Sequence, residues 1–286
     1  SFSKLGEMGQ LGNQLFQYAF LRSSAKRLGT TFYCPPWRGD EIFELNDSAE
    51  RANFPENIIL SYTEPHYNFG FNSEALKIKD CTELSGYFQS PLYLHRDDVL
   101  NWYKFKDSIT QIRNQYSHID FANSVSLSLR INDDYNFRRH LYPLYPLKYY
   151  RKALQLVPQK KHILIFADRI DRAKKYFRGL SGKNVLFVEG PTDVEQLYMI
   201  SLCRNNIITD STYSWWGAYL NLHDDKTVVA PLEWIRPGVG RTAENIMVEN
   251  WITIKTLKPW QHYKPWLMQL RAKQLVRKAL LLDRKN

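Results

Sequence analysis

Polar side chains that could bind a phosphate follow three predicted strands in the second half of the chain. Arg130, Asp168 and the hydroxyl-rich segment Ser211-Thr-Tyr-Ser214 each come directly after a β-rich or compact apolar run. Ligands of open parallel α/β sheets bind beyond the carboxyl ends of the strands, so we expect these residues to face one pocket. A guanidinium and the unsatisfied N–H groups at the start of a helix both suit phosphate groups. Together the three segments predict a pocket for a nucleotide diphosphate.

Each segment also has a structural interpretation that the sequence leaves open. Arg130 could pair with nearby aspartates, and Asp168 could either cap the next helix or accept hydrogen bonds from ribose or guanine. Ser211 could be an N-cap, with Trp215 and Trp216 packing that helix onto the sheet. The chain has no Walker lysine motif, no complete dinucleotide fingerprint and no metal-ligand spacing. We therefore expect cationic and backbone donors, rather than a metal ion, to hold the diphosphate.

The first half opens with the turn Gly9-Gln-Leu-Gly12 directly before an amphipathic run. The glycines could serve only a tight strand-to-helix turn, or they could let the backbone approach a ligand at the helix N-terminus. Apolar spacing predicts a helix over Asn13–Leu28 that ends at Gly29. Strands over Phe2–Met8 and Thr30–Cys34 would complete a β-turn-α-β unit.

Regular alternation of strands and helices begins near residue 119, whereas residues 35 to 118 are irregular apart from 84–90, which has the pattern of a strand leading into a loop. The expected strands are 124–129, 162–166, 184–188, 206–209 and 226–230, and the expected helices are 146–156, 171–177, 193–203 and one from 214 to 220. Five strands separated by helices predict a doubly wound parallel sheet. The last segment, 264–286, has the pattern of a basic amphipathic helix that could pack on the body, act as a linker or contact a membrane surface.

The charge composition of the chain limits the classes of partner that it could bind. The chain carries 39 Lys and Arg against 29 Asp and Glu, a net charge of +10, which favours anionic partners. No nucleic-acid-binding signature is present, so we expect no nucleic acid. Cys34, Cys81 and Cys203 are far apart, which argues against a disulfide framework or a structural zinc.

No apolar run could span a membrane and no signal peptide opens the chain. A complete chain would be cytoplasmic, whereas the start at Ser1 indicates a module cut from a longer chain, whose compartment would be unknown.

The segment GQLGNQLFQYAF closely resembles the GGLGNQMFQYAF start of the α-1,2-fucosyltransferases of glycosyltransferase family 11. LSGYFQSPLYL, YPLKYYRKAL, FADRID and DSTYSWWGAYLN resemble further segments of that family in the same order. The resemblance implies a GT-B-type α/β fold, with two Rossmann-like halves facing across a cleft. It implies an N-terminal acceptor-side domain over 1–118, a nucleotide-sugar domain over 119–255 and a basic tail over 256–286. The implied activity is a metal-independent, inverting transfer of fucose from GDP-fucose to a sugar hydroxyl in glycan synthesis.

The resemblance also implies roles for single residues. Arg130 would pair with the β-phosphate of the donor, and the acceptor would be a glycan or oligosaccharide. The implied donor-binding residues are Gly12, Asn13, Gln14, Arg130, Asp168, Ser211, Thr212, Ser214 and Trp215; the acceptor-side residues are His66, Tyr87 and Gln89; the catalytic residues are Arg130, Asp133 and Asp134. The general base stays open among Asp133, Asp134 and His66.

One motif departs from the family. Ser128 replaces its histidine, Ile131 replaces its second arginine, and one residue is added before Tyr135. Two alternatives therefore stay open: another nucleotide-sugar donor, or a glycan-binding module without catalysis.

Overall fold

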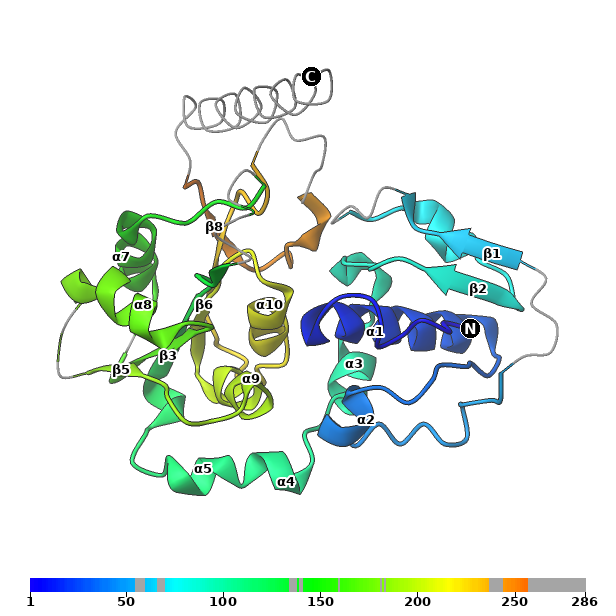
Figure 1. Ribbon diagram of the computed structural model, residues 1–286, viewed down its shortest axis with the longest axis horizontal. Helices are drawn as coiled ribbons and strands as arrows, with labels where there is room; N and C mark the ends of the chain where they lie inside the picture. Colours follow the sequence, from blue (N-terminus) through cyan, green and yellow to red (C-terminus); the bar gives the residue numbers. More distant parts are fainter. Residues whose placement is uncertain are drawn as a thin grey trace, which may run out of the picture.

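The computed structural model describes residues 1–54, 60–65, 70–133, 138, 141–158, 160–180, 182, 184–236 and 244–256. His66, Asp134 and the predicted helix at 264–286 lie outside these residues. The described chain forms two α/β halves side by side, with α1 (Leu11–Leu28) and α10 (Thr212–Tyr219) where they meet (Figure 1).

The C-terminal half contains a six-stranded parallel sheet in the order β5-β4-β3-β6-β7-β8. Its strands are β3 (Ser124–Leu129), β4 (His162–Ala167), β5 (Val185–Phe187), β6 (Asn205–Ile207), β7 (Val228–Pro231) and β8 (Ile252–Ile254). The chain runs outward from β3 to β5 and then returns to β6 on the other side of β3. The strand order thus reverses between β3 and β6, and a crevice for ligands opens at such a point in doubly wound sheets.

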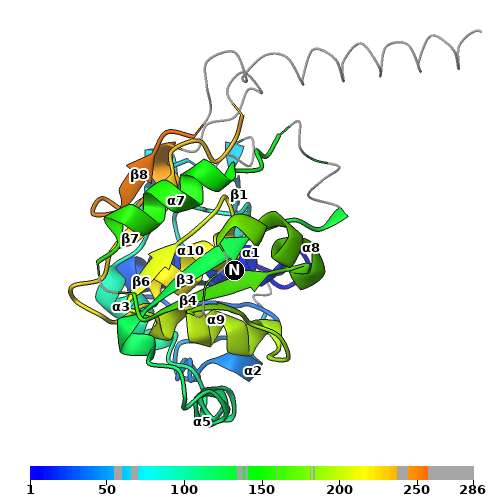
Figure 2. The ribbon, with the colours of Figure 1, turned by 90° about the vertical axis from the view of Figure 1, so that its left-hand side faces the viewer.

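Helices cover both faces of this sheet (Figure 2). They are α7 (Leu147–Leu156) and α8 (Ile170–Tyr176) on one face, and α9 (Asp193–Leu202) and α10 on the other. Alternate side chains of β4 explain the layering, because Ile163 and Ile165 pack in the cluster of α7 and α8, whereas Leu164 and Phe166 pack with α9. The predicted sheet and its helices are confirmed; β8, which has only three residues, was not expected.

The N-terminal half is built around α1, which ends as predicted at Gly29 in the left-handed conformation (φ 66°). Its remaining elements are α2 (Gly39–Ile42), the parallel pair β1 (Leu60–Thr63) and β2 (Thr82–Ser85), and α3 (Arg96–Trp102); α4 (Asp107–Thr110) and α5 (Ile112–Gln115) lead to the other half. Short 3₁₀ turns lie at Ser73–Lys77, Pro91–Tyr93, Phe121–Asn123, Arg178–Leu180 and Glu244–Ile246.

The strands predicted on either side of α1 are wrong. Gly6 and Gly9 have φ of 95° and 77°, so the chain turns where Phe2–Met8 was expected to be extended. Phe32 makes only an isolated parallel bridge to Arg51. Single backbone bonds nevertheless keep these segments side by side, since the N–H of Phe2 donates to Tyr33 O at 2.9 Å. The two segments therefore lie side by side as in a Rossmann-like unit, but they form too few consecutive backbone hydrogen bonds to be strands.

The two halves share one aromatic core. Phe16 of α1 packs on Trp215 and Trp216 of α10, with ring centroids 4.6 and 4.7 Å away. All three side chains are fully buried in a cluster that also holds Phe20 and Trp234. The start of α1 and the start of α10 are therefore fixed relative to each other by packing.

Candidate active site

The two helices α1 and α10 meet at their N-termini. A Cβ at Gly12 would lie 2.6 Å from the backbone N of Tyr213 and 2.7 Å from Thr212 Oγ1, so only glycine fits between the helices. The indole N–H of Trp216 donates to Gly12 O at 2.9 Å and ties the two helix starts together. Gly12 thus serves packing, and this packing brings two helix starts to one place.

Neither helix start is capped by a side chain. Gln10 and Ser211 occupy the N-cap positions, and neither makes a side-chain cap hydrogen bond. Both residues, together with Gly12 and Thr212, line the same cleft. First-turn N–H groups and the positive ends of two helix dipoles therefore border this cleft, an environment that stabilises a bound anion.

The cleft has a volume of about 1180 Å³ and is lined by residues of both halves. It is large for a single small-molecule site, which typically occupies roughly 300–1,000 Å³. Of the predicted residues it contains Gly12, Asn13, Gln14, Tyr87, Gln89, Arg130, Asp168, Ser211, Thr212 and Ser214. Residues that are far apart in the sequence are thus brought together as the strand-end argument and the family resemblance implied.

Arg130 is half-buried where β3 ends, in the crevice beside β6. The loop that follows it is held by Asp168, whose carboxylate accepts from the N–H of Ile131 at 2.7 Å and from the N–H of Asn132 at 3.3 Å. Arg172 holds the same loop from the other side by donating to Ile131 O at 3.1 Å. Asp168 therefore lines the cleft and also fixes the segment that carries Arg130.

Asn13 joins a residue predicted for the acceptor side to one predicted for the donor side. Its Oδ1 accepts from Gln89 Nε2 at 2.8 Å and from Thr212 Oγ1 at 2.9 Å. Gln14 acts within its own half, because its Nε2 donates to Gly6 O and Gly9 O at 3.0 and 3.2 Å. Asn13 is thus the side chain through which the two predicted groups of residues touch.

Two predicted site residues lie elsewhere. Trp215 is fully buried behind the cleft wall, and its indole N–H donates to Ile246 O at 2.7 Å. Asp133 points its largely exposed carboxylate at Arg172 (2.6 Å) and Arg169 (3.6 Å) and does not line the cleft. Trp215 therefore supports the site by packing, and Asp133 is not brought to it.

Sequence reasoning missed a pair of charged residues at the cleft. The Arg38 guanidinium donates to both carboxylate oxygens of Asp193, at 2.6 and 2.5 Å, and so links the two halves. This hydrogen-bonded carboxylate raises the pKa of Arg38 above its usual value. No local pattern could have revealed the pair, because Arg38 falls in the irregular region and its partner is 155 residues away.

Buried polar residues at the ends of β3 and β6 were missed as well. They are Ser128, Thr209 and Asp210, all of which line the cleft. The strand-end rule that selected Arg130 and Ser211 would have found them if it had been applied one or two residues earlier in each segment.

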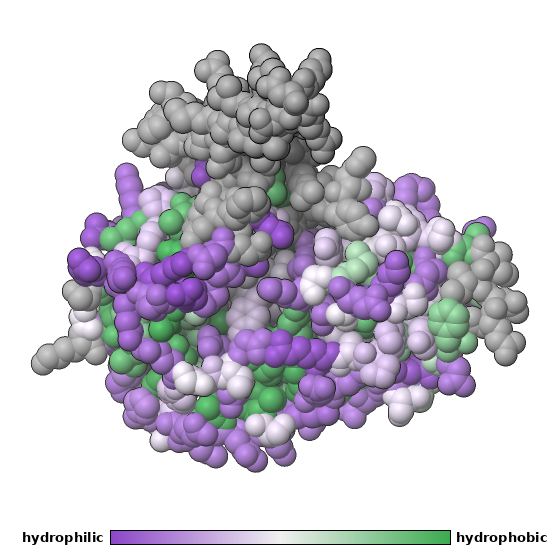
Figure 3. Space-filling view, viewed as in Figure 1, coloured by the Kyte–Doolittle hydropathy of each residue, from purple (hydrophilic) through white to green (hydrophobic). Residues whose placement is uncertain are grey.

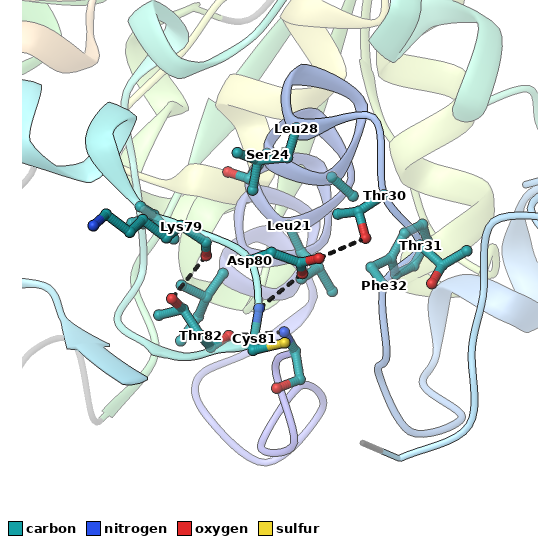
Figure 4. Close-up of a pocket in the computed structure, with 14 residues that line it drawn as sticks. Leu21, Ser24, Leu28, Thr30, Thr31, Phe32, Lys79, Asp80, Cys81 and Thr82 are labelled. Atoms are coloured by element: carbon teal, nitrogen blue, oxygen red, sulfur yellow. Dashed lines mark hydrogen bonds between the residues drawn. The ribbon is translucent and has the colours of Figure 1, made fainter. Parts of the chain in front are cut away.

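A second hollow lies beneath the C-terminal half of α1 (Figure 4). Its volume is only about 30 Å³. Thr30 Oγ1 and the N–H of Cys81 both donate to the carboxylate of Asp80 in its wall, at 3.0 and 2.8 Å. Since a single water needs about 10–15 Å³, this hollow is too small for a sugar or a nucleotide.

The described part of the chain holds no group of three or more His, Cys, Asp and Glu residues placed to bind a metal ion. The same residues include no helix with the length and apolar character needed to cross a membrane.

Known proteins are similar to this chain in sequence or in fold. The O-antigen biosynthesis glycosyltransferase WbnK of Escherichia coli is 29% identical over 205 residues, 66% of this chain and 65% of that protein. The alpha-1,2-colitosyltransferase of Escherichia coli is 25% identical over 261 residues, 79% of this chain and 90% of that protein. The crystal structure of POFUT1 in its apo form superposes with a TM-score of 0.51 at 11% identity, covering 80% of this chain and 96% of that one.

These comparisons confirm the GT-B-type α/β fold predicted from the sequence. The matched region spans just under two thirds of the length of WbnK. The family profile described as "Glycosyl transferase family 11" matches residues 7–255, most of the chain. The chain therefore belongs to glycosyl transferase family 11.

Proposed function

We propose that this family 11 glycosyltransferase transfers fucose from GDP-fucose to a hydroxyl group of a glycan acceptor. The observation that carries the proposal is the convergence of two uncapped helix N-termini and Arg130 on one cleft between the halves. In this arrangement backbone N–H groups and a guanidinium could bind a diphosphate, and the proposal requires no metal ion.

The chemistry follows from where charge develops. The bond between the anomeric carbon and the β-phosphate oxygen breaks, and GDP leaves with the electron pair. The acceptor oxygen bonds to the opposite face of the anomeric carbon, and its proton passes to water. Donors already fixed at α1, α10 and Arg130 would stabilise the growing charge on the β-phosphate more strongly than mobile water does.

The acceptor would enter from the N-terminal half, where Tyr87 and Gln89 line the cleft. Gln89 contacts Asn13, which in turn contacts Thr212 at the start of α10. An acceptor hydroxyl held by this side of the cleft would lie opposite the leaving diphosphate, as inversion requires.

Colitose is the second candidate for the transferred sugar. It differs from fucose only by lacking the hydroxyl at carbon 3, and one relative is an alpha-1,2-colitosyltransferase. A site that hydrogen-bonds the 3-hydroxyl would discriminate strongly against GDP-colitose, whereas an apolar contact there would accept both sugars.

Calorimetric titration of GDP, UDP and ADP into the protein with excess EDTA tests the donor site. We expect GDP alone to bind tightly, and then GDP-fucose to support transfer in the same buffer at an undiminished rate. Equal or absent binding of all three nucleotides would contradict a guanine-specific site. Binding of GDP together with transfer from GDP-colitose only would favour the second candidate.

The segment 256–286 is included in the proposal only because its sequence is basic. Attraction to anionic headgroups would place the enzyme beside a membrane-bound acceptor. Cosedimentation with vesicles of phosphatidylglycerol, compared with vesicles of phosphatidylcholine, tests this, with a chain ending at Thr256 as the control.

A further inference from the structure

Glu64 is a buried carboxylate that supports the cleft without lining it. It is the first residue after β1, beside the point where the neighbouring strand β2 ends. Its side chain is almost completely buried, and its Oε2 accepts from the N–H of Tyr87 at 2.7 Å and from the N–H of Phe88 at 3.0 Å. One carboxylate oxygen thus holds two successive backbone groups of the loop after β2.

This loop makes a tight turn in an uncommon conformation. Phe88 has φ of 52°, in the left-handed region that phenylalanine rarely adopts. Its ring is fully buried and stacks on Phe20, with centroids 4.0 Å apart and planes 7° apart. A Cβ at Gly86 would lie 2.4 Å from Glu64 Cβ, and Gln17 Nε2 donates to Gly86 O at 2.9 Å. The unusual turn is therefore held by the packing of Phe88 on Phe20 and by hydrogen bonds to the side chains of Glu64 and Gln17.

The turn delivers two side chains to the cleft. Tyr87 and Gln89 both line it, and Gln89 Nε2 reaches Asn13 Oδ1 at 2.8 Å. Within the described part of the chain, the side-chain hydrogen bonds of Glu64 go to the turn after β2 and reach neither α10 nor the loop after β3. A shift of this turn would therefore move Tyr87 and Gln89 first and would reach the start of α10 only through Asn13.

We propose that Glu64 is a positioning residue that sets the affinity for the acceptor sugar by fixing the turn that carries Tyr87 and Gln89. The identification of this turn as acceptor-binding rests on the proposed function; the hold of Glu64 on the turn does not.

The positioning depends on hydrogen bonding and not on charge. Glu64 Oε1 is buried without a hydrogen-bond partner among the described residues. Burial raises the pKa of this carboxyl, although the two N–H donors oppose the rise. The titratable side chains that feel its charge are the phenols of Tyr62 and Tyr93. If Oε1 carried a proton, Oε2 could still accept the hydrogen bonds from the N–H groups of Tyr87 and Phe88. The oxygen of a side-chain amide at this position can accept the same two hydrogen bonds.

Three variants separate hydrogen bonding from other effects of the substitution. In Glu64→Gln one oxygen still accepts both N–H groups; in Glu64→Asp the carboxylate is withdrawn by one carbon; in Glu64→Leu the acceptor is lost. We expect Glu64→Leu to raise the acceptor KM at least tenfold while the dissociation constant for GDP and the slow hydrolysis of GDP-fucose without acceptor stay within twofold. Glu64→Gln should stay within twofold in every parameter. The matched control is Glu74→Leu, at an exposed carboxylate whose ion pair with Lys77 lies outside the cleft.

Amide hydrogen exchange at Tyr87 and Phe88 gives a readout that does not require activity. Both amides should be protected in the wild type and in Glu64→Gln and should exchange at least tenfold faster in Glu64→Leu. If Glu64→Leu fails to fold, Glu64→Asp replaces it with the same expected direction.

An unchanged acceptor KM, or a loss of GDP affinity equal to the loss of acceptor affinity, would overturn the proposal. Unchanged exchange at the two amides would do so even if the wild type transferred no fucose. A wild type that binds GDP but transfers no fucose, with exchange altered as expected, would contradict only the proposed function.

Discussion

Arg130 can stabilise charge only if its position is fixed before the donor binds. The carboxylate of Asp168 and the guanidinium of Arg172 hold the adjacent backbone of Ile131 from two sides. Preorganised donors of this kind are effective because they need not reorient as charge develops. The loop after β3 is therefore as much a part of the site as the arginine that it carries.

Replacing Arg130 with alanine should leave the fold intact and lower the transfer rate by roughly 10² to 10³, the usual cost of losing one donor to a developing negative charge. Steady-state transfer from GDP-fucose measures the loss, and thermal unfolding checks the fold. Arg113→Ala, at an exposed arginine outside the cleft, is the control. A variant that keeps more than about a tenth of the wild-type turnover would show that Arg130 is not the principal donor.

Arg38 should affect binding more than stability. Its ion pair with Asp193 is about half exposed on both sides, and exposed pairs contribute about 0–1 kcal/mol. At the edge of a cleft for an anionic ligand, however, Arg38→Ala removes a cation, and we expect GDP to bind about tenfold more weakly, which corresponds to about 1.4 kcal/mol. Parallel calorimetry and thermal melts test this, and a large fall in the melting temperature with unchanged GDP affinity would assign Arg38 a structural role instead.

Much of the site could be predicted at the residue scale because strand ends are readable from local patterns and the family motifs are contiguous. This pattern placed Arg130, Asp168 and Ser211 in one pocket, and all three line the cleft. Arg38 and Asp193 could not be found, since their pairing depends on how the two halves meet. Trp215 was assigned to the donor because a motif does not show which of its side chains face inward.

At the element scale, the site depends on the approach of α1 and α10. The glycine at position 12 allows a contact between helix starts that a methyl group would block. Both roles considered for the opening glycines are thus compatible here, because the tight packing itself places two helix dipoles at one cleft.

Gly12→Ala should therefore separate the two helix starts. The backbone of Tyr213 cannot yield as a flexible side chain could, so we expect a loss of roughly 1–3 kcal/mol in unfolding free energy, as for other overpacked sites. Chemical denaturation and GDP titration of the same sample measure both consequences. Gly29→Asn serves as the control because position 29 has open space and asparagine tolerates its left-handed conformation. Wild-type stability in Gly12→Ala would mean that α10 can move without cost.

Elements with a strong periodic pattern of apolar residues could be predicted from the sequence. Segments that make only a few backbone hydrogen bonds could not. The sheet of the C-terminal half was correct because its strands are buried apolar runs between helices. Phe2–Met8 and Thr30–Cys34 have suitable residues for strands, but glycine turns and tertiary contacts leave them with isolated hydrogen bonds. The segment 84–90, predicted as a strand that leads into a loop, leaves strand β2 at Ser85, because Glu64 accepts from the N–H groups of the next turn.

At the scale of the whole molecule, several exposed cations lie close together on the C-terminal half. Hydrophilic side chains gather over α7 and α8 in the face shown in Figure 3. The exposed cations there are Lys148, Arg151, Lys152, Lys174, Lys175 and Arg178. Such charges act at long range and are screened by salt, whereas the donors inside the cleft act at contact distance.

Donor binding should accordingly weaken as ionic strength rises. We expect the dissociation constant for GDP to increase several-fold between 50 and 500 mM sodium chloride, because salt screens both the surface field and the phosphate contacts. Guanosine, which lacks phosphates, should bind weakly and without this dependence. Equal salt dependence for GDP and guanosine would show that the phosphates are not recognised electrostatically.

The shared aromatic core has a consequence for how the protein can be divided. Phe16 and Phe20 from the first half and Trp215, Trp216 and Trp234 from the second belong to one buried cluster. Either half made alone would leave large rings facing water, so neither should fold independently. Calorimetric unfolding of the intact chain should give a single transition. A chimera that joins the first half of one family member to the second half of another should fold only if the residues of this cluster are exchanged together with it.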